Sequence, residues 1–363
     1  MKKFLAIMLS LMLLTGLFPC AGVAESKPLT VVTTIFPIYD WARQIIGENE
    51  NTNLVLLLDN GVDLHSYQPS AQDIMTISTA DLFIYVGGES DEWVEDVLES
   101  AMNPDLVAIS LTEAMGEDLK EEEIVEGMQH DHDHDHEDED HDHEEDHHED
   151  HDHDHEEDHD HDEDHDEDHD HDEDHDHDHE HEHEDEYDEH VWLSLRNARK
   201  LTVAIAEALA GIDAANADAI RENAAAYDAQ LQELDAKYTE TVENAALKTV
   251  LFGDRFPFRY LTDDYGLTYY AAFTGCSAES EASFETIAFL AGKADELNLP
   301  AVLTIEGGNH KIADTVIAAS SKTDRKVLTM NSMQSVTADD VKNGMTYLSI
   351  MEENLTVLKE ALN

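Results

Sequence analysis

The feature that most limits what this chain can fold into is a segment made almost only of histidine and acidic residues. Residues 130–189 contain 21 His and 38 Asp or Glu, and Tyr187 is the single other residue. Such a segment has no apolar side chains to offset the entropy lost on folding, and its carboxylates repel one another. We therefore expect residues 117–186 to be a disordered His/Asp/Glu-rich loop, in which Glu117–Gln129 can briefly continue a helix.

The charge and the histidines of this segment point to different conclusions. The formal net charge is −65 for the chain, but only −27 without residues 130–189. A chain this acidic is repelled by phosphates, which excludes a nucleic-acid-binding protein. Imidazole is a good ligand for Zn, Ni and Cu, so the alternating His and Asp residues indicate weak binding of several metal ions. The alternative is a solvated acidic spacer.

The first 24 residues have the pattern of a secretory signal peptide. Met1–Lys3 is basic, Phe4–Phe18 is apolar but too short to span a bilayer, and small residues precede Glu25. We expect an exported, extracytoplasmic protein, at the cell surface or in the periplasm. Cys20 stands where a lipoprotein cysteine could stand, so lipidation there is an alternative to cleavage after Ala24. Cys276 is the other cysteine, and the mature chain is expected to have no internal disulfide.

Short apolar runs alternate with helical patterns on both sides of the insert, as in parallel βαβ units. Before the insert, strands are expected at Leu29–Thr34, Asn53–Leu58, Leu82–Val86 and Leu106–Ile109, and helices at Pro37–Ile46 and Ser70–Thr79. After it, strands are expected at Thr249–Phe252, Thr268–Phe273, Ala301–Ile305 and Lys326–Met330, and helices at Ser283–Glu296 and Lys311–Ser320. The fold class is thus α/β, with two lobes of mainly parallel sheets. Residues 28–116 and 187–212 form the N-terminal lobe, and residues 247–363 form the C-terminal lobe.

Residues 213–246 are expected to form one long helix that connects the lobes. This stretch contains neither Pro nor Gly, and its apolar residues recur at spacings of three and four. About 32 residues would give a helix of ~48 Å, long enough to cross a whole domain. The alternative is a helical hairpin.

Three histidines lie outside the insert, and two of them stand in motifs that suit metal binding. His65 follows an apolar strand, and ligands in open α/β sheets collect at the carboxyl ends of strands. His190 opens the sequence His190–Val191–Trp192–Leu193, whose apolar residues provide a wall against which the ring can be fixed. His310 opens a helix and is read as a surface residue.

These motifs resemble those of the periplasmic or cell-surface metal-binding proteins of zinc and manganese ABC transporters, over essentially the whole mature chain. The family loop G-x-D-x-H-x-Y-x-P-S is matched by residues 61–70, and its D-x-H-V-W-L motif by residues 188–193. A His-rich acidic loop before the second motif is a mark of the zinc members. The resemblance implies two lobes joined by a rigid helix and one metal in the cleft, with His65 and His190 as ligands from the first lobe.

The second lobe departs from the family pattern. Zinc relatives have a third His after the first strand of that lobe, where this chain has Asp254 and Arg255. Asp254 is the expected ligand there, with a turn-capping role as the alternative, and Arg255 could pair with a carboxylate. Glu306 follows a strand and matches a Glu that relatives carry. Neutral amides, Asn331 and Gln334, occupy the stretch where relatives place an acidic ligand, so Glu306, His310 or water is left to complete the site.

The resemblance implies capture of Zn²⁺ between the lobes and its delivery to an ABC permease with its ATPase. Mn²⁺ and Ni²⁺ are alternative ions. The chain is expected to be a monomer that meets the membrane through the permease and through Cys20 if it is lipidated. A metal buffer or surface adhesin without a transport role is the alternative. A zinc-dependent hydrolase is less favoured, because the sequence has no H-E-x-x-H and no G-x-S-x-G motif, and no enzymatic activity is expected.

Overall fold

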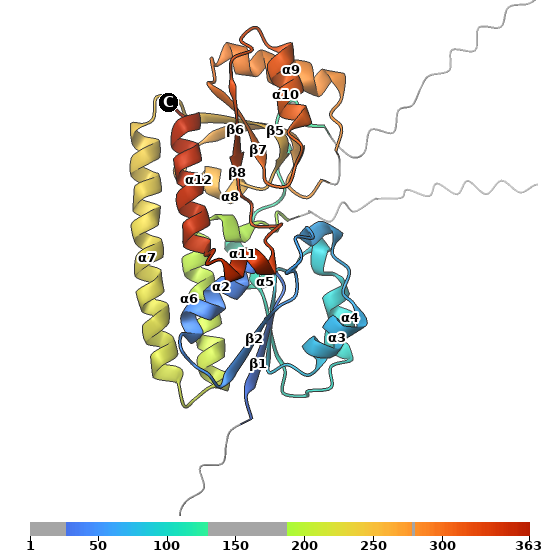
Figure 1. Cartoon of the computed structure of the whole chain (residues 1–363), viewed down its shortest axis with the longest axis vertical. Helices are drawn as coiled ribbons and strands as arrows, with labels where there is room; N and C mark the ends of the chain where they lie inside the picture. Colours follow the sequence, from blue (N-terminus) through green and yellow to red (C-terminus); the bar gives the residue numbers. More distant parts are fainter. Residues whose placement is uncertain (1–26, 130–186, 278–279) are drawn as a thin grey trace, which may run out of the picture.

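The computed structural model describes residues 27–129, 187–277 and 280–363. The predicted signal peptide, Cys20 and the predicted disordered segment from 130 to 186 lie outside the described residues. Within these ranges the chain forms two α/β lobes and a long helix that runs beside both (Figure 1). This arrangement confirms the predicted fold class. No helix in the described ranges is both long enough and apolar enough to cross a membrane.

The first lobe is built around a four-stranded parallel sheet with the strand order β2-β1-β3-β4. Its strands are β1 (Leu29–Thr33), β2 (Thr52–Leu56), β3 (Leu82–Tyr85) and β4 (Val107–Ser110). Its helices are α2 (Phe36–Ile46), α3 (Ala71–Ser78), α4 (Trp93–Glu99), α5 (Leu111–Met115) and α6 (Leu195–Ile212). The strand order reverses direction at β1, which is where open α/β sheets usually place their ligands.

Local sequence explains where these elements begin. The central strands β1 and β3 are short apolar runs because both faces of the sheet are covered, and Val31, Val32 and Phe83 are fully buried. Helix α3 begins after Ser70, whose hydroxyl accepts a hydrogen bond from Asp73 N while the Asp73 carboxylate accepts one from Ser70 N. This reciprocal pair of hydrogen bonds is a capping box.

The second lobe repeats the architecture of the first, with the parallel strand order β6-β5-β7-β8. Its strands are β5 (Thr249–Phe256), β6 (Thr268–Thr274), β7 (Ala301–Ile305) and β8 (Lys326–Met330). Its helices are α8 (Arg259–Tyr265), α9 (Phe284–Glu296), α10 (Lys311–Ala319), α11 (Ala338–Lys342) and α12 (Tyr347–Ala361). Strand β5 extends four residues beyond the predicted end and contains an irregularity between Phe252 and Arg255.

The connecting helix is α7 (Ala217–Asn244), which begins four residues later and ends two residues earlier than predicted. Its 28 residues correspond to about 42 Å. One stripe of the helix is buried, formed by Ile220, Ala224, Tyr227, Leu231, Leu234, Tyr238 and Val242. It packs on α6, α2 and α12, and Tyr238 donates a hydrogen bond from its hydroxyl to Met351 O of α12 at 2.7 Å. The helix is thereby attached to elements of both lobes.

Residues 117–129, placed in the disordered loop on sequence grounds, instead lie against the second lobe with defined contacts. Lys120 N donates to the hydroxyl of Tyr260 at 3.0 Å, and Gln129 N donates to Ala272 O at 3.0 Å. The expectation of disorder was wrong for these residues, because single residues within the acidic segment make contacts with the second lobe. The expected brief continuation of a helix is present at its start as a 3-10 turn, Gly116–Asp118. Met128, for example, is only 7% exposed.

Candidate metal centre

His65 lies in a short 3-10 turn, Leu64–Ser66, that follows β2. Asp63 precedes the turn, and its Oδ1 accepts a hydrogen bond from His65 N at 3.0 Å and contacts His65 Nδ1 at 2.8 Å. The second ring nitrogen, Nε2, is buried and has no hydrogen-bond partner among the described residues. A histidine whose Nδ1 is held by a carboxylate while Nε2 is left free has the arrangement found in metal sites.

His190 repeats this arrangement from another part of the chain. Asp188 Oδ1 accepts a hydrogen bond from His190 N at 2.8 Å and contacts Nδ1 at 2.9 Å. The His190 side chain is completely buried, and its Nε2 also has no partner in the described structure. Burial lowers the pKa of His190, although Asp188 opposes this effect. The ring is therefore kept neutral, which is the form that binds metals.

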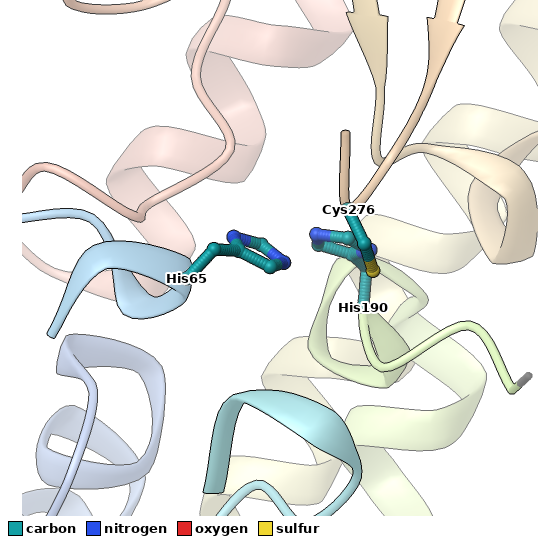
Figure 2. A group of neighbouring side chains, drawn as sticks. All are labelled: His65, His190 and Cys276. Carbon is teal, nitrogen blue, oxygen red and sulfur yellow. The ribbon is translucent and has the colours of Figure 1, made fainter. Parts of the chain in front are cut away.

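The two histidines lie side by side, and a cysteine joins them. The ring centroids of His65 and His190 are 5.3 Å apart. Cys276, two residues after the end of β6, brings its Sγ to the same place, and one potential ligand atom from each of the three residues lies within 4.8 Å of the others (Figure 2). Ligand atoms around a tetrahedral zinc are about 3.5 Å apart, so small side-chain shifts would suffice to hold an ion.

The loop that carries Cys276 is packed tightly against His190. A Cβ atom placed on Gly275 would lie 2.8 Å from Cε1 and 3.0 Å from Nδ1 of the His190 ring. On its other side, Cys276 N donates a hydrogen bond to Glu122 Oε1 at 3.3 Å, so the ordered segment 117–129 helps to place the loop. Burial raises the pKa of the Cys276 thiol well above its usual value, and the carboxylates of Glu189 and Glu122 add to this effect. In the absence of a metal the side chain is thus a thiol.

Sequence reasoning did not identify Cys276 as a ligand. The cysteine was considered only for disulfide pairing, because a thiol in a loop has no local pattern comparable to the D-x-H motifs. The available signal was its position at the carboxyl end of a predicted strand, where ligands collect.

The two acidic residues named from the sequence lie near this centre but have other partners. Asp254 lines the same cavity as His65, about 470 Å³ in volume, yet its Oδ1 accepts Arg255 N at 2.9 Å and its Oδ2 accepts Ile305 N at 3.2 Å. Glu306 accepts hydrogen bonds from Ser332 N at 2.6 Å and from Gln334 N at 3.0 Å. Neither carboxylate belongs to the three-residue cluster found among the described residues.

Arg255 pairs with a carboxylate, as was considered from the sequence. Its guanidinium forms an ion pair with Asp63 and donates to Gln334 Oε1 at 3.1 Å. Burial acts to raise the pKa of Asp63, but the hydrogen bond with His65 and the charge of Arg255 outweigh it, and the pKa lies below its usual range. Asp63 is therefore a fixed carboxylate at neutral pH.

His310, which was read as a surface residue, also borders the cavity. Its backbone is left-handed, with φ of 56°, and its Nδ1 lies 2.9 Å from Thr304 Oγ1. This hydrogen bond occupies one ring nitrogen without the carboxylate support that His65 and His190 have.

Two further carboxylates are buried in the first lobe close to the histidines. Asp91 is 3% exposed and Glu189 is 2% exposed, and each has one oxygen without a described partner. Burial raises the pKa of Asp91 to about 6, against the opposing effect of hydrogen bonds from Gly87 and Val86. Burial also raises the pKa of Glu189. Two buried carboxyl groups thus act electrostatically on His65, and burial disfavours the charged form of both.

Comparison with known proteins agrees with this architecture. Residues 31–361 match the family described as zinc-uptake complex component A, periplasmic. The chain is 28% identical to the high-affinity zinc uptake system protein ZnuA of Bacillus subtilis (strain 168), over 94% of this chain and 90% of that protein. It is 29% identical to the zinc-binding lipoprotein AdcA of Streptococcus pneumoniae (strain ATCC BAA-255 / R6), over 99% of this chain but only 61% of that protein.

A solved structure supports the same relationship. The Zn(II)-bound ZnuA-like domain of Streptococcus pneumoniae AdcA superposes with a TM-score of 0.63 at 25% identity, over 92% of this chain and 98% of that domain. The match to the family extends over nearly the whole described chain, including both lobes, the connecting helix and both D-x-H motifs. The chain therefore belongs to the family of periplasmic zinc-uptake complex component A proteins.

Proposed function

We propose that this protein captures Zn²⁺ between its two lobes, with His65 and His190 as ligands, and delivers the ion to an ABC-type permease. The observation that carries the proposal is the pair of buried Nε2 atoms that have no hydrogen-bond partner among the described residues, each on a ring whose Nδ1 is held by an aspartate. A buried polar atom without a partner is costly, and two of them facing one another are explained by a cation that both can bind.

The donor atoms favour zinc over the harder alternatives. Imidazole nitrogens suit Zn²⁺ and Ni²⁺, whereas Mn²⁺ prefers carboxylate and carbonyl oxygen. The zinc named for the relatives ZnuA and AdcA supports the same choice. A competition titration with Zn²⁺, Mn²⁺, Ni²⁺ and Cu²⁺ tests the selectivity directly.

The His-rich insert is proposed to raise the local concentration of ions beside this site. Its first end is held on the second lobe, where Gln129 Oε1 accepts Ser283 N at 2.6 Å. Its other end is followed by Tyr187, three residues before His190, and Tyr187 forms an isolated β-bridge with Glu121. Three residues thus separate the end of the insert from the proposed ligand His190, so ions bound weakly by its histidines would be released near that residue.

Delivery to a permease requires that the protein act outside the cytoplasm. Its proposed partners are the permease and the associated ATPase, and the protein would contact the membrane through the permease. The signal-peptide pattern of residues 1–24 and the uptake role named for the Bacillus subtilis relative support this placement. Lipidation of Cys20 remains the alternative to cleavage after Ala24. Zinc uptake by cells that contain the cognate permease, with and without this chain, tests the transport role.

Histidine variants test the proposed ligands. His65→Ala and His190→Ala should each lower Zn²⁺ affinity by at least ~10-fold in competition with a chromophoric chelator, because losses at metal sites are of that size or larger. His310→Asn is the matched control, since it removes another imidazole from the cavity that His65 lines, and Asn tolerates the left-handed backbone. An unchanged affinity in His65→Ala or His190→Ala would remove that residue from the site.

Asp254 and Glu306 remain proposed ligands that the same assay can test. Their carboxylates already accept backbone hydrogen bonds, so we expect Asp254→Ala and Glu306→Ala to change Zn²⁺ affinity less than the histidine variants do. A loss of ~10-fold or more in Asp254→Ala would place its carboxylate in the coordination shell.

Binding and transport are proposed in preference to hydrolysis. The relatives are named for zinc binding and zinc uptake, and their names mention no reaction. The zinc-loaded protein should show no turnover of ester or peptide substrates above that of the His190→Ala variant.

A further inference from the structure

We propose that Cys276 is the third protein ligand of this site, as a thiolate, so that the cargo is held by two imidazoles and one sulfur. This inference rests on the proposed metal site at His65 and His190 and adds to it the donor atom that defines the class of ion. The aspartate and glutamate named from the sequence would then lie outside the inner coordination shell.

The placement of the sulfur is the first argument. Cys276 Sγ and one ring nitrogen from each of His65 and His190 lie within 4.8 Å of one another, although the three residues come from distant parts of the chain. Figure 2 shows the cysteine side chain beside the ring of His190, with the ring of His65 facing them. Two donors thus come from the first lobe and one from the loop after β6 in the second lobe.

The second argument is independent of the cysteine. His190 is completely buried, and its Nε2 has no hydrogen-bond partner in the described part of the chain. The same holds for the buried Nε2 of His65. These atoms require a partner that can approach both of them, and a metal ion shared with the sulfur supplies one.

The third argument concerns the backbone next to the cysteine. Gly275 lies so close to the His190 ring that a Cβ atom would come within 2.8 Å of it. The absence of a side chain at this position lets the loop approach until the sulfur reaches the imidazoles.

The chemistry of binding is balanced without any further reactant. The thiol releases its proton to solvent as the metal–sulfur bond forms, and no electron is transferred. A donor set of two nitrogens and one thiolate favours Zn²⁺ and Cd²⁺, whereas Mn²⁺ is disfavoured by soft sulfur. A fourth position is left for water or for a nearby carboxylate.

Cobalt substitution tests the inference in the full chain. Thiolate bound to Co²⁺ produces a sulfur-to-metal charge-transfer band in the near ultraviolet, which the cysteine-free His-rich insert cannot produce. The parent protein carries Cys20→Ser, so that Cys276 is its single thiol, and Cys20→Ser/Cys276→Ser is the matched variant. We expect the band in the parent and its loss in the variant, with Zn²⁺ affinity lowered at least ~10-fold and the preference for Zn²⁺ over Mn²⁺ reduced.

The outcomes separate this inference from the function it rests on. Tight binding by the parent without the sulfur band would overturn the role of Cys276 and leave the histidine site standing. Loss of tight binding in every protein, the parent included, would refute the proposed function and this inference together. Because the band is read in the parent, the test does not depend on the folding of the double variant.

Discussion

Arg255 and Asp63 form an ion pair that joins the second lobe to the carboxylate holding the ring of His65. The two oxygens of Asp63 are shared between the lobes, since Oδ2 contacts Arg255 and Oδ1 contacts His65 Nδ1. The orientation of His65, a proposed ligand from the first lobe, therefore depends on a residue of the second lobe. A change in the relative position of the lobes would reach His65 through this carboxylate.

Removal of this carboxylate should weaken metal binding. Asp63→Ala leaves His65 Nδ1 without its acceptor and frees the ring to rotate, so Zn²⁺ affinity should fall by about 10–100-fold. Chelator competition measures the effect. Asp73→Ala is the control, because it removes a half-buried carboxylate that caps α3 and should lower the free energy of unfolding by about 1 kcal/mol without a change in affinity. Equal affinities in Asp63→Ala and the parent would show that the ring is fixed by packing alone.

The close contact between Gly275 and His190 makes a second prediction. Gly275→Ala should displace the imidazole or the loop, and lower Zn²⁺ affinity by at least ~10-fold while the protein still folds. Gly292→Ala is the matched control, since no atom lies within 4 Å of the new Cβ and the position is inside helix α9. This control should keep its affinity and raise the free energy of unfolding by about 0.5–1 kcal/mol. A Gly275→Ala protein with unchanged affinity would contradict the close packing described above.

The buried carboxylate of Asp91 predicts a specific pH dependence of stability in the metal-free protein. The pKa of this group is raised to about 6 in the folded state, so the folded protein holds the proton more tightly than the unfolded chain does. The stabilisation by the protonated carboxyl group is complete below the unfolded pKa near 4 and is lost as the pH rises through about 6. Asp91→Asn does not titrate. The variant should therefore gain up to about 3 kcal/mol in unfolding free energy relative to the parent between pH 4 and pH 7.

Denaturant unfolding at several pH values measures this difference. The lowered pKa of His190 acts in the opposite direction, since it makes stability rise with pH up to about 6.5, but it is common to both proteins and cancels in the comparison. Parallel pH profiles for the parent and Asp91→Asn would mean that Asp91 titrates at its ordinary value in the folded protein.

Deletion of residues 130–186 should separate the weak metal sites from the tight one. Calorimetry should then detect a single tight Zn²⁺ site, because the proposed ligands lie in the described lobes and the other 21 histidines of the segment are removed. A control that replaces these histidines with asparagine preserves the length of the loop. If neither protein retains a tight site, the assignment of the site to the lobes is wrong.

Much of the fold could be predicted because its signals are local. The bounds of β7 and β8 match the predicted ranges, and α9 begins directly after its capping residue Ser283. The stripe of apolar residues that predicted α7 is the stripe that is buried in the structure. The two D-x-H motifs were recognisable from their resemblance to the family motifs, and the structure adds that each aspartate contacts the ring of the histidine two residues later.

The remaining features depend on contacts between distant residues. The ordered course of residues 117–129 rests on partners such as Tyr260 and Ala272, more than a hundred residues further along the chain. Asp254 and Glu306 were proposed as ligands because each follows a strand, but in the structure their carboxylate oxygens accept hydrogen bonds from backbone N–H groups. No sequence pattern indicates from which donor a given carboxylate will accept its hydrogen bonds.

The sequence by itself determined the two α/β lobes, the long helix beside them and the two histidines with their supporting aspartates, since each is encoded within a few consecutive residues. Only the tertiary structure decided that Cys276 meets His65 and His190, and that Arg255 reaches Asp63. These contacts depend on how the ends of β2 and β6 and the segment 188–193 pack against one another across the two lobes. Such packing depends on the shapes of many side chains at once. One example is Gly275, where there is no room for a Cβ atom beside the His190 ring.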